Sequence, residues 1–535
     1  MLAPGSRSTP LALALVSHTG ISTQIFHDER NAGFAALGVG VTTGVPAVVL
    51  CSSGTAAAHF YASVIEADAS CIPMIVCTAD RPPHLRDVAA PQTIDQTKLF
   101  GDAVRWFHDP GVPTAIPSST WRALAARIVD ETRRHSPGPV HVNLPFDEPL
   151  FGVPGDLPAP RSQRWSSTHL GSELSSTAVT ELAQMFSQRR GVFIAGRRTP
   201  IEILRCAENL GWPIFADPRS GVRVSHDNVI AGFDALLRIP EMTRRYEPDI
   251  VVSIGEAPAS KVLSQWLSSL ECDIVQVHDD DKVKDPLHKV SHAYMCDTSH
   301  LFSRLCDENM SNVNGEWLTS WKNSDEIAQD VISKWTSHHW SEISVSRVLS
   351  QSMGRGSQLV VSSSMPIRDF EWFGDVLDNV DVFANRGANG IDGVVSTAIG
   401  AAVATQKTTY VLIGDVAFLH DSNSLLNLST RGVDLRIVVT NNDGGSIFSF
   451  LPQAQHVENE QFEKIYGTPH GVVLASLCEA HNVRHVDVSS GEELRTALTN
   501  EGPIVIECRF DRGINVGLHD EVHRLVTDAV SANLA

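Results

Sequence analysis

The stretch that decides the fold runs from Gly414-Asp415 to NNDGG at residues 441–445, near the end of the chain. Each of these two signals follows an apolar, β-branched run, at residues 408–413 and 435–440, which predicts a buried strand. The segment between the signals carries leucines at helical spacing and a glycine near its end, so we expect a helix there. A strand, a helix and a strand of these lengths form a right-handed crossover between two parallel strands.

This crossover predicts a binding site at the edge of the sheet. It brings the carboxylate of Asp415 and the amide of Asn442 to the carboxyl ends of parallel strands, where ligands of open α/β folds bind. Mg²⁺ prefers one or two carboxylate or carbonyl oxygens together with phosphate oxygens. A sequence such as NNDGG is typical of a turn when it stands alone. The spacing of the two signals by one crossover favours a magnesium-diphosphate site instead.

Length and composition limit the class of protein. The 535 residues are too many for a single core, and they predict about two to four domains. With 42% hydrophobic and 19% charged residues, the composition is ordinary for a soluble globular enzyme. The net charge of −20 argues against nucleic acid or an anionic membrane as the partner. No apolar run approaches the ~20 residues of a membrane span, and the first residues show no signal peptide. Nine cysteines without a C-x-x-C pattern favour reduced thiols and a cytoplasmic location.

The chain divides into three blocks in which strand-like runs alternate with helical stretches. The predicted fold class is therefore α/β, with three doubly wound parallel-sheet domains. We place these domains at residues 1–155, 177–335 and 342–535. A passage rich in proline and serine, residues 145–176, predicts a linker between the first two. A polar stretch at residues 309–341 leads into the third block, which carries the diphosphate motif.

Several motifs occur in the order in which one enzyme family has them. They are PGSRSTP at residues 4–10, DER at 28–30, SGTA at 53–56, TADRPP at 78–83, NRGANGIDG at 385–393 and GSIFSFLPQ at 445–453. Together with the diphosphate motif, they resemble the signatures of the MenD family. Its members are thiamin diphosphate (ThDP)-dependent synthases of 2-succinyl-5-enolpyruvyl-6-hydroxy-3-cyclohexene-1-carboxylate in menaquinone biosynthesis. One departure from the wider superfamily is Val416, which stands where most members have a second glycine after Gly-Asp.

The resemblance implies a fold and a reaction. The three blocks would be a pyrimidine-binding, a central and a diphosphate-binding domain, with active sites shared between two chains of a homodimer or homotetramer. The enzyme would use ThDP and Mg²⁺, which Mn²⁺ can replace. It would decarboxylate 2-oxoglutarate and add the succinyl carbanion equivalent to isochorismate in a Stetter-like 1,4-addition. These two small molecules would be its partners, and neither nucleic acid nor a membrane would be involved.

The resemblance also assigns roles to individual residues. Those implied in catalysis are Glu29, which would activate the coenzyme through its aminopyrimidine ring, Arg368 and Arg386. Besides Glu29, the cofactor-binding residues would be Ser53, Gly54, Ile391, Gly414, Asp415, Asn442, Gly444, Ile447, Phe448 and Leu451. The metal ligands would be Asp415, Asn442 and the carbonyl group of Gly444. Arginine suits substrates with two carboxylates each, because its planar fork holds a carboxylate by two hydrogen bonds. The residues implied to bind the substrates are Ser6, Arg7, Arg81, Gln92, Lys261, Ser364, Arg368 and Arg386.

The sequence is also compatible with two other functions and with another role for Glu29. The chain could be another ThDP-dependent enzyme, such as a 2-oxoacid decarboxylase or an acetohydroxyacid synthase, which would need fewer arginines for carboxylates. It could be a truncated, inactive homologue, because the family normally has a further helix and strand ahead of Pro4. A parallel sheet without its first strand exposes an apolar edge. For Glu29 alone, the alternative to a catalytic role is an ion pair at the start of a helix, with Arg30 or with another lysine or arginine.

Two further patterns, one of glycines and one of histidines, resemble known binding motifs but have simpler explanations. Gly38-Val39-Gly40 with Gly44 suggests a dinucleotide-binding loop, but the spacing is wrong and a helical stretch precedes it. His519 and His523 are one helical turn apart, as zinc ligands can be, but a solvated terminal helix explains them better.

Overall fold

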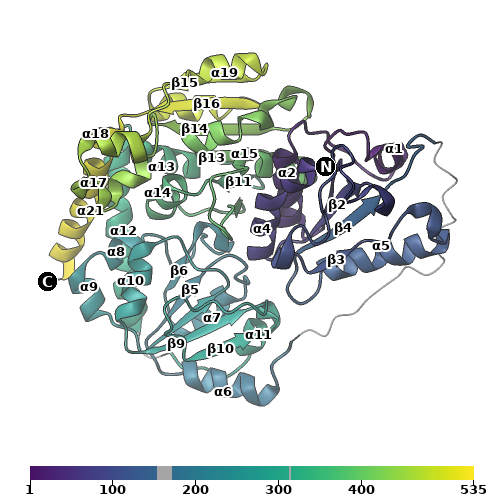
Figure 1. Ribbon diagram of the computed structural model, residues 1–535. Helices are drawn as coiled ribbons and strands as arrows, with labels where there is room; N and C mark the ends of the chain where they lie inside the picture. The colour runs from purple at the N-terminus through teal and green to yellow at the C-terminus, as the bar shows by residue number, and fades with distance from the viewer. Residues whose placement is uncertain (153–171, 313–314, 535) are drawn as a thin grey trace.

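The computed structural model describes residues 1–152, 172–312 and 315–534 and shows three α/β blocks, each built on a parallel sheet (Figure 1). The first block lies on the right in Figure 1, the second at the bottom and the third across the top left. Most of the predicted linker, residues 153–171, lies outside the described residues. Among the described residues, no helix is both long and apolar enough to cross a membrane.

The first block contains a four-stranded sheet in the order β1-β2-β4-β3. Leu2 is bridged to Leu50 of β1 on one side and to Ile25 on the other. The outer edge of β1 is therefore hydrogen-bonded, and the open apolar edge expected here is absent from the described part of the block. The elements are β1 (Ala47–Cys51), β2 (Met74–Asp80), β3 (Trp106–His108), β4 (Pro139–Pro145), α1 (Thr9–Ser17), α2 (Glu29–Thr43), α3 (Thr55–Ala58), α4 (Tyr61–Ala69) and α5 (Ser118–Thr132).

The second block contains a six-stranded sheet in the order β10-β9-β8-β5-β6-β7. Its strands are β5 (Gly191–Ala195), β6 (Ile214–Ala216), β7 (Val229–Ile230), β8 (Ile250–Ile254), β9 (Asp273–His278) and β10 (His292–Met295). Its helices are α6 (Ser176–Phe186), α7 (Ile203–Leu210), α8 (Phe233–Leu237), α9 (Pro240–Arg245), α10 (Lys261–Ser269), α11 (Thr298–Leu305) and α12 (Gly315–His338). The polar stretch that leads into the third block is mostly α12, which buries three tryptophans against the second block.

The third block contains a six-stranded sheet in the order β12-β11-β13-β14-β16-β15. Its strands are β11 (Gln358–Val361), β12 (Asp381–Phe383), β13 (Thr409–Gly414), β14 (Leu435–Asn441), β15 (Arg484–Val488) and β16 (Ile504–Arg509). Its helices are α13 (Glu342–Ser352), α14 (Met365–Phe373), α15 (Val394–Thr405), α16 (Asp415–His420), α17 (Gln453–His456), α18 (Asn459–Phe462), α19 (Leu474–Ala480), α20 (Gly491–Ala497) and α21 (Arg512–Leu534).

The decisive crossover is confirmed in its strands but not in its helix. β13 and β14 are adjacent and parallel, as the apolar runs predicted. The predicted helix is only α16, which is followed by two short 3₁₀ turns. α16 ends where the carboxylate of Asp421 turns inward. That carboxylate accepts hydrogen bonds from the Ser396 backbone N–H at 2.7 Å and from Asn31 Nδ2 at 2.6 Å.

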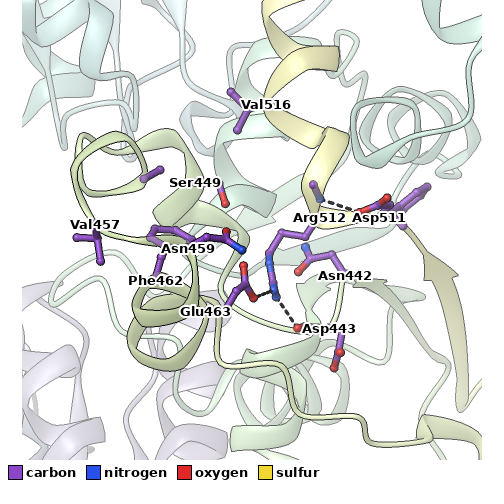
Figure 2. A pocket seen from close by; sticks show the side chains of 13 residues that line it. Asn442, Asp443, Ser449, Val457, Asn459, Phe462, Glu463, Asp511, Arg512 and Val516 are labelled. Carbon is purple, nitrogen blue, oxygen red and sulfur yellow. Dashed lines mark hydrogen bonds and ion pairs between the residues drawn. The ribbon is translucent and has the colours of Figure 1, made fainter.

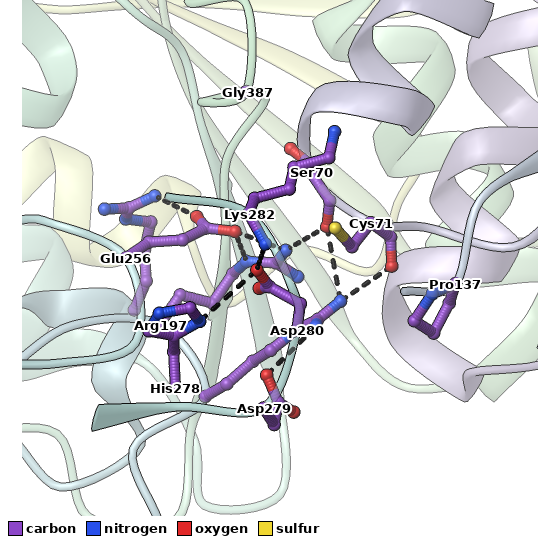
Figure 3. Close-up of polar contacts among 12 residues, drawn as sticks. Ser70, Cys71, Pro137, Arg197, Glu256, His278, Asp279, Asp280, Lys282 and Gly387 are labelled. Carbon is purple, nitrogen blue, oxygen red and sulfur yellow. Dashed lines mark hydrogen bonds and ion pairs between the residues drawn. The ribbon is translucent and has the colours of Figure 1, made fainter. Parts of the chain in front are cut away.

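Polar contacts join the first block to the other two, and Figure 3 shows those with the second block. From the second block, Arg197 donates a hydrogen bond to the carbonyl oxygen of Ser70 at 2.5 Å. From the third block, the backbone N–H groups of Gly387 and Ala388 donate to the two carboxylate oxygens of Glu66, at 2.8 and 2.7 Å. The loop at the end of β12 is thus fixed by a buried carboxylate of the first block.

Helices α2 and α15 cross at close range between the first and third blocks. A Cβ atom at Gly38 would lie 2.0 Å from the Thr397 carbonyl oxygen, and one at Gly400 would lie 1.9 Å from that of Ala35. Only glycine permits such an approach of two backbones. α2 runs through the glycine pattern and ends at Gly44, whose φ is 66°. The pattern therefore belongs to a packed helix and not to a dinucleotide-binding loop.

We expect Gly400→Ala to destabilise the protein by about 1–3 kcal/mol, the usual cost of overpacking a close contact. In an open helix the same change would stabilise by about 1 kcal/mol, because alanine is the better helix former. Gly517 in α21 has open space around it and provides that control. Thermal unfolding should show a lower midpoint for Gly400→Ala and an unchanged or higher one for Gly517→Ala. Equal shifts in both variants would contradict the packing argument.

Candidate active site

Asp415 is the first residue of α16 and is buried at the carboxyl end of β13. Its Oδ2 accepts hydrogen bonds from the backbone N–H groups of Gly444 at 2.9 Å and Asn442 at 3.2 Å. Its Oδ1 accepts from the backbone N–H of Val416 at 2.7 Å. A histidine that the sequence analysis missed, His470, places Nε2 3.2 Å from Oδ2. The structure therefore brings together the two signals that the sequence placed at one sheet edge.

The side-chain amide of Asn442 has a hydrogen-bond partner for its nitrogen but none for its oxygen among the described residues. Its Nδ2 donates a hydrogen bond to Oε1 of Glu342 at 3.0 Å. Its Oδ1 is buried and has no hydrogen-bond partner among the described residues. A buried carbonyl-type oxygen without a donor is costly unless a cation or water satisfies it. This oxygen is a suitable ligand for Mg²⁺.

Gly444 completes the set of candidate ligands with its backbone. Its φ is 139°, and a Cβ atom there would lie 1.9 Å from the carbonyl oxygen of Gly467. Only glycine fits this position. A carboxylate, an amide oxygen and a backbone carbonyl are oxygen donors of the kind that Mg²⁺ accepts beside two phosphates. The residues present fit a magnesium-diphosphate group.

The start of α21 braces this loop (Figure 2). Arg512 donates to the carbonyl oxygens of Asp443 and Gly467 and forms an ion pair with Glu463. The backbone N–H of Gly445 donates to the same Gly467 carbonyl oxygen at 2.8 Å. A cavity of about 600 Å³ lies beside the loop. The sequence carried no signal for Arg512, because its partners are distant in the chain.

Four apolar residues expected at the cofactor are half-buried, as side chains that line a cavity can be. Ile447 and Phe448 lie in a 3₁₀ turn directly after the loop of candidate metal ligands at residues 441–445, and Leu451 follows that turn. The Phe448 ring lies 5.3 Å from the Tyr466 ring, measured between centroids. Ile391 packs against the core cluster that the first and third blocks share.

The amino-terminal set of candidate residues gathers at the carboxyl edge of the first sheet. Arg81 donates a hydrogen bond to the hydroxyl of Ser53, and Gln92 donates to the Ser53 carbonyl oxygen at 3.1 Å. Arg7 is buried and lies close enough to Arg81 to lower its pKa, in addition to the larger effect of burial. The predicted members of this set are Ser6, Arg7, Ser53, Gly54, Arg81 and Gln92. Gln96, which the sequence did not indicate, lies beside them. Its side chain donates hydrogen bonds to Asn143 and to the Ala79 carbonyl oxygen, and it accepts one from the backbone N–H of Gly54.

Glu29 begins α2 but does not cap it. The helix is capped by Asp28, whose carboxylate accepts from the backbone N–H of Arg30 at 2.9 Å and pairs with its guanidinium at 2.7 Å. The proposed Glu29–Arg30 ion pair is therefore wrong. Glu29 is half-buried and close to Cys51 at the end of β1, where its charge adds to burial in raising the pKa of that thiol. Among the described residues, the Glu29 carboxylate has no hydrogen-bond or ion-pair partner and is therefore available to another group.

The carboxy-terminal set lies in the second and third blocks. Arg368 donates to the Ser364 carbonyl oxygen within α14, and Ser364 has a φ of 75°. Burial, and then the nearby cations Arg219 and Arg368, lower the pKa of Arg386 to about 10. Asp217 and Glu371 offset part of this repulsion, and Arg219 is already paired with Asp217 and Glu256. Arg368 and Arg386 are therefore the two cations available to hold anions. Besides these residues, the set contains Lys261, Ile391, Gly414, Asp415, Asn442, Gly444, Ile447, Phe448 and Leu451.

Arg219 is the member that the sequence did not indicate. It is buried and forms ion pairs with Asp217 at 2.8 Å and Glu256 at 3.4 Å. Lys261 is exposed at the first position of α10. Two residues before Lys261, the backbone N–H of Ala259 donates to Oε2 of Glu371 in α14 at 2.9 Å.

Glu371 makes the stability of the protein depend on pH. Burial, and then the nearby Asp217 and Asp234, raise its pKa from 4.5 to about 8. The folded protein keeps this proton, while the unfolded chain releases it above pH 4.5. Stability therefore falls as pH rises through this window, by at most about 1.4 kcal/mol per pH unit. Glu371→Gln should remove this fall, so that its advantage in thermal midpoint grows between pH 5 and pH 8. If the thermal midpoints of the wild type and of Glu371→Gln changed in parallel with pH, this prediction would be wrong.

The expected solvated terminal helix at His519 is wrong. His519 is 1% exposed, and its Nε2 lies 2.9 Å from Oδ1 of Asp369 while Nδ1 donates to the Asn515 carbonyl oxygen. Burial lowers and Asp369 raises the pKa of His519, and the net shift is upward. Burial holds the pKa of His523 well below its usual value. Neither histidine belongs to a metal-ligand cluster in the described part of the chain.

Among the described residues, no hydrogen bond or ion pair joins the two sets. The hydrogen bonds and ion pairs of the amino-terminal set stay within the first block. Those of the carboxy-terminal set stay within the second and third blocks.

Comparisons with known proteins agree with this architecture. Residues 1–99 match the N-terminal TPP (thiamine pyrophosphate, ThDP) binding domain of thiamine pyrophosphate enzymes, residues 160–361 match their middle domain, and residues 381–508 match their C-terminal TPP binding domain. A solved structure of a benzoylformate decarboxylase from Polynucleobacter necessarius superposes with a TM-score of 0.72, covering 96% of this chain and 95% of that one. At 16% identity it shows the shared fold. Fold and site together define a ThDP-dependent enzyme.

Proteins of similar sequence identify one family within this class of ThDP-dependent enzymes. A 2-succinyl-5-enolpyruvyl-6-hydroxy-3-cyclohexene-1-carboxylate synthase of Chloroflexus aurantiacus is 37% identical, over 99% of this chain and 94% of the relative. The enzyme of the same name from Geobacillus thermodenitrificans is 36% identical over 100% and 94%, and that of Listeria monocytogenes 35% over 99% and 95%. The chain belongs to this family of synthases, so the expected resemblance is confirmed.

Proposed function

We propose that this enzyme decarboxylates 2-oxoglutarate and adds the resulting four-carbon succinyl unit to isochorismate, the reaction that yields the compound in its relatives' name. The observation that carries the proposal is the pair of half-buried arginines Arg368 and Arg386, whose charges repel each other and which have no ion-pair partner among the described residues. Two substrates with two carboxylates each would relieve this repulsion. A decarboxylase for a simple 2-oxoacid has no need of so many cations.

The bound coenzyme would supply the electron sink that the loss of carbon dioxide requires. Asp415, Asn442 and the carbonyl of Gly444 would hold its diphosphate through Mg²⁺, or through Mn²⁺ in its place. Glu29 would share a proton with the aminopyrimidine ring. The arginines would orient both substrates and exclude water from the reacting carbon, since water would protonate it before the addition.

The lack of hydrogen bonds and ion pairs between the two sets, among the described residues, is consistent with an assembly of two or more chains. We propose that the amino-terminal set and Glu29 of one chain face the carboxy-terminal set of another. A homodimer or homotetramer would then contain complete sites at its interfaces. The reduced state of nine cysteines without a disulfide is consistent with our proposal of a cytoplasmic enzyme.

The direct test follows the loss of isochorismate absorbance with 2-oxoglutarate, ThDP and Mg²⁺ present. Omission of any one component should stop the reaction. Consumption of 2-oxoglutarate without isochorismate would instead favour a simple 2-oxoacid decarboxylase. An inactive protein that still binds ThDP and Mg²⁺ would favour the inactive homologue.

A further inference from the structure

We infer that Glu342 is a positioning residue that fixes the side-chain amide of Asn442 so that its oxygen faces the cation. The inference rests on the proposed ThDP and Mg²⁺ site. Glu342 starts α13, 100 residues before Asn442, and no sequence motif connects the two. Its side chain is buried, with 2% of its surface exposed.

The contact itself selects one orientation of the amide. Oε1 of Glu342 accepts a hydrogen bond from Nδ2 of Asn442 at 3.0 Å. A carboxyl group keeps at least one acceptor oxygen in either protonation state. The observed amide orientation, with Nδ2 toward Glu342, therefore satisfies both groups. Against an ionised carboxylate, which has no proton to donate, rotation by half a turn would place two acceptor oxygens against each other. In the selected orientation Oδ1 points to the other side, where it is buried without a partner.

The backbone on either side of Asn442 is already fixed. The N–H groups of Asn442 and Gly444 both donate to Oδ2 of Asp415, at 3.2 and 2.9 Å. The remaining freedom of the site is the rotation of the Asn442 amide. Glu342 removes that freedom before the cation arrives, which is the usual role of groups that hydrogen-bond to metal ligands.

The test compares three substitutions of Glu342 by their affinity for Mn²⁺. Mn²⁺ binding is measured by the EPR signal of the free ion, with saturating ThDP and no substrates. Glu342→Leu removes the acceptor, and Glu342→Asp keeps a carboxylate that is one methylene too short. Both should weaken Mn²⁺ binding by about 10–100-fold. Glu342→Gln retains an acceptor oxygen and should bind Mn²⁺ nearly as well as the wild type.

A matched control comes from Glu371, another buried carboxylate that accepts a backbone hydrogen bond but touches no candidate metal ligand. Glu371→Leu should leave Mn²⁺ affinity unchanged, whatever it does to the thermal midpoint. In Glu342→Leu, kcat should recover as the metal concentration is raised, while KM for 2-oxoglutarate stays constant.

Two results would overturn the inference. One is wild-type Mn²⁺ affinity in folded Glu342→Asp or Glu342→Leu. The other is an equal loss in Glu342→Gln, which would show that charge and not amide orientation is what matters. Failure of the wild type itself to bind Mn²⁺ with ThDP would refute the proposed function and, with it, this inference.

Discussion

Substitution of Asp415 by Asn is expected to abolish turnover and to weaken Mn²⁺ binding at least about 100-fold, beyond the effect of removing a supporting group. Asp415 is the only carboxylate among the three candidate ligands, so the change removes the negative charge that the cation meets. It also places an amide N–H among groups that now donate to the carboxylate. These are the backbone N–H groups of Val416, Asn442 and Gly444. Whichever way the amide turns, at least one pair of donors is opposed.

Binding of Mn²⁺ in the presence of ThDP measures the first effect, and isochorismate loss measures the second. Asp443→Asn is the matched control two residues before Gly445. The Asp443 side chain is exposed, and its Oδ1 accepts from the backbone N–H groups of His470 and Gly471. An Asn can keep both bonds, so only a small change is expected. If Asp415→Asn retained Mn²⁺ affinity while Asp443→Asn lost it, the assignment of the metal site would be wrong.

The parts of the fold that the sequence predicted are those set by strong local patterns. Apolar β-branched runs located β13 and β14, and the fixed geometry of parallel crossovers then placed Asp415 beside Asn442. The helix between them was predicted from leucine spacing, but a long-range contact overrode that pattern. Asp421 is drawn into the core by Asn31, almost 400 residues away, and no local rule contains that partner.

The same limit explains the missed site residues. Glu342 and Arg512 act through partners distant in sequence, and Arg219, although it pairs locally with Asp217, affects the distant Arg386. Neither spacing nor motif pointed to these three residues. His519 was misjudged for a different reason. It lies on the same face of α21 as Val522 and Val526, and that apolar spacing could have shown that the face is buried.

Substitution of Glu29 by Gln is expected to lower turnover by about 10²–10⁴-fold, the usual contribution of a general acid–base group. The fold should not change. Asp28 already caps α2 and already pairs with Arg30, so the helix does not depend on the carboxylate of Glu29. Gln has the same shape, and Glu29 is only half-buried. The thermal midpoint and the Mn²⁺ affinity of Glu29→Gln should therefore match those of the wild type.

This separation of effects distinguishes Glu29 from the candidate metal ligands. Asp415→Asn should lose metal binding and turnover together, whereas Glu29→Gln should lose turnover while the coenzyme and metal remain bound. An amide can still hydrogen-bond to the aminopyrimidine ring but cannot accept and return its proton. Turnover is the rate of isochorismate loss at saturating ThDP and Mg²⁺. Wild-type turnover in Glu29→Gln would remove the carboxylate from the mechanism, because its remaining contacts near Cys51 would then be purely structural.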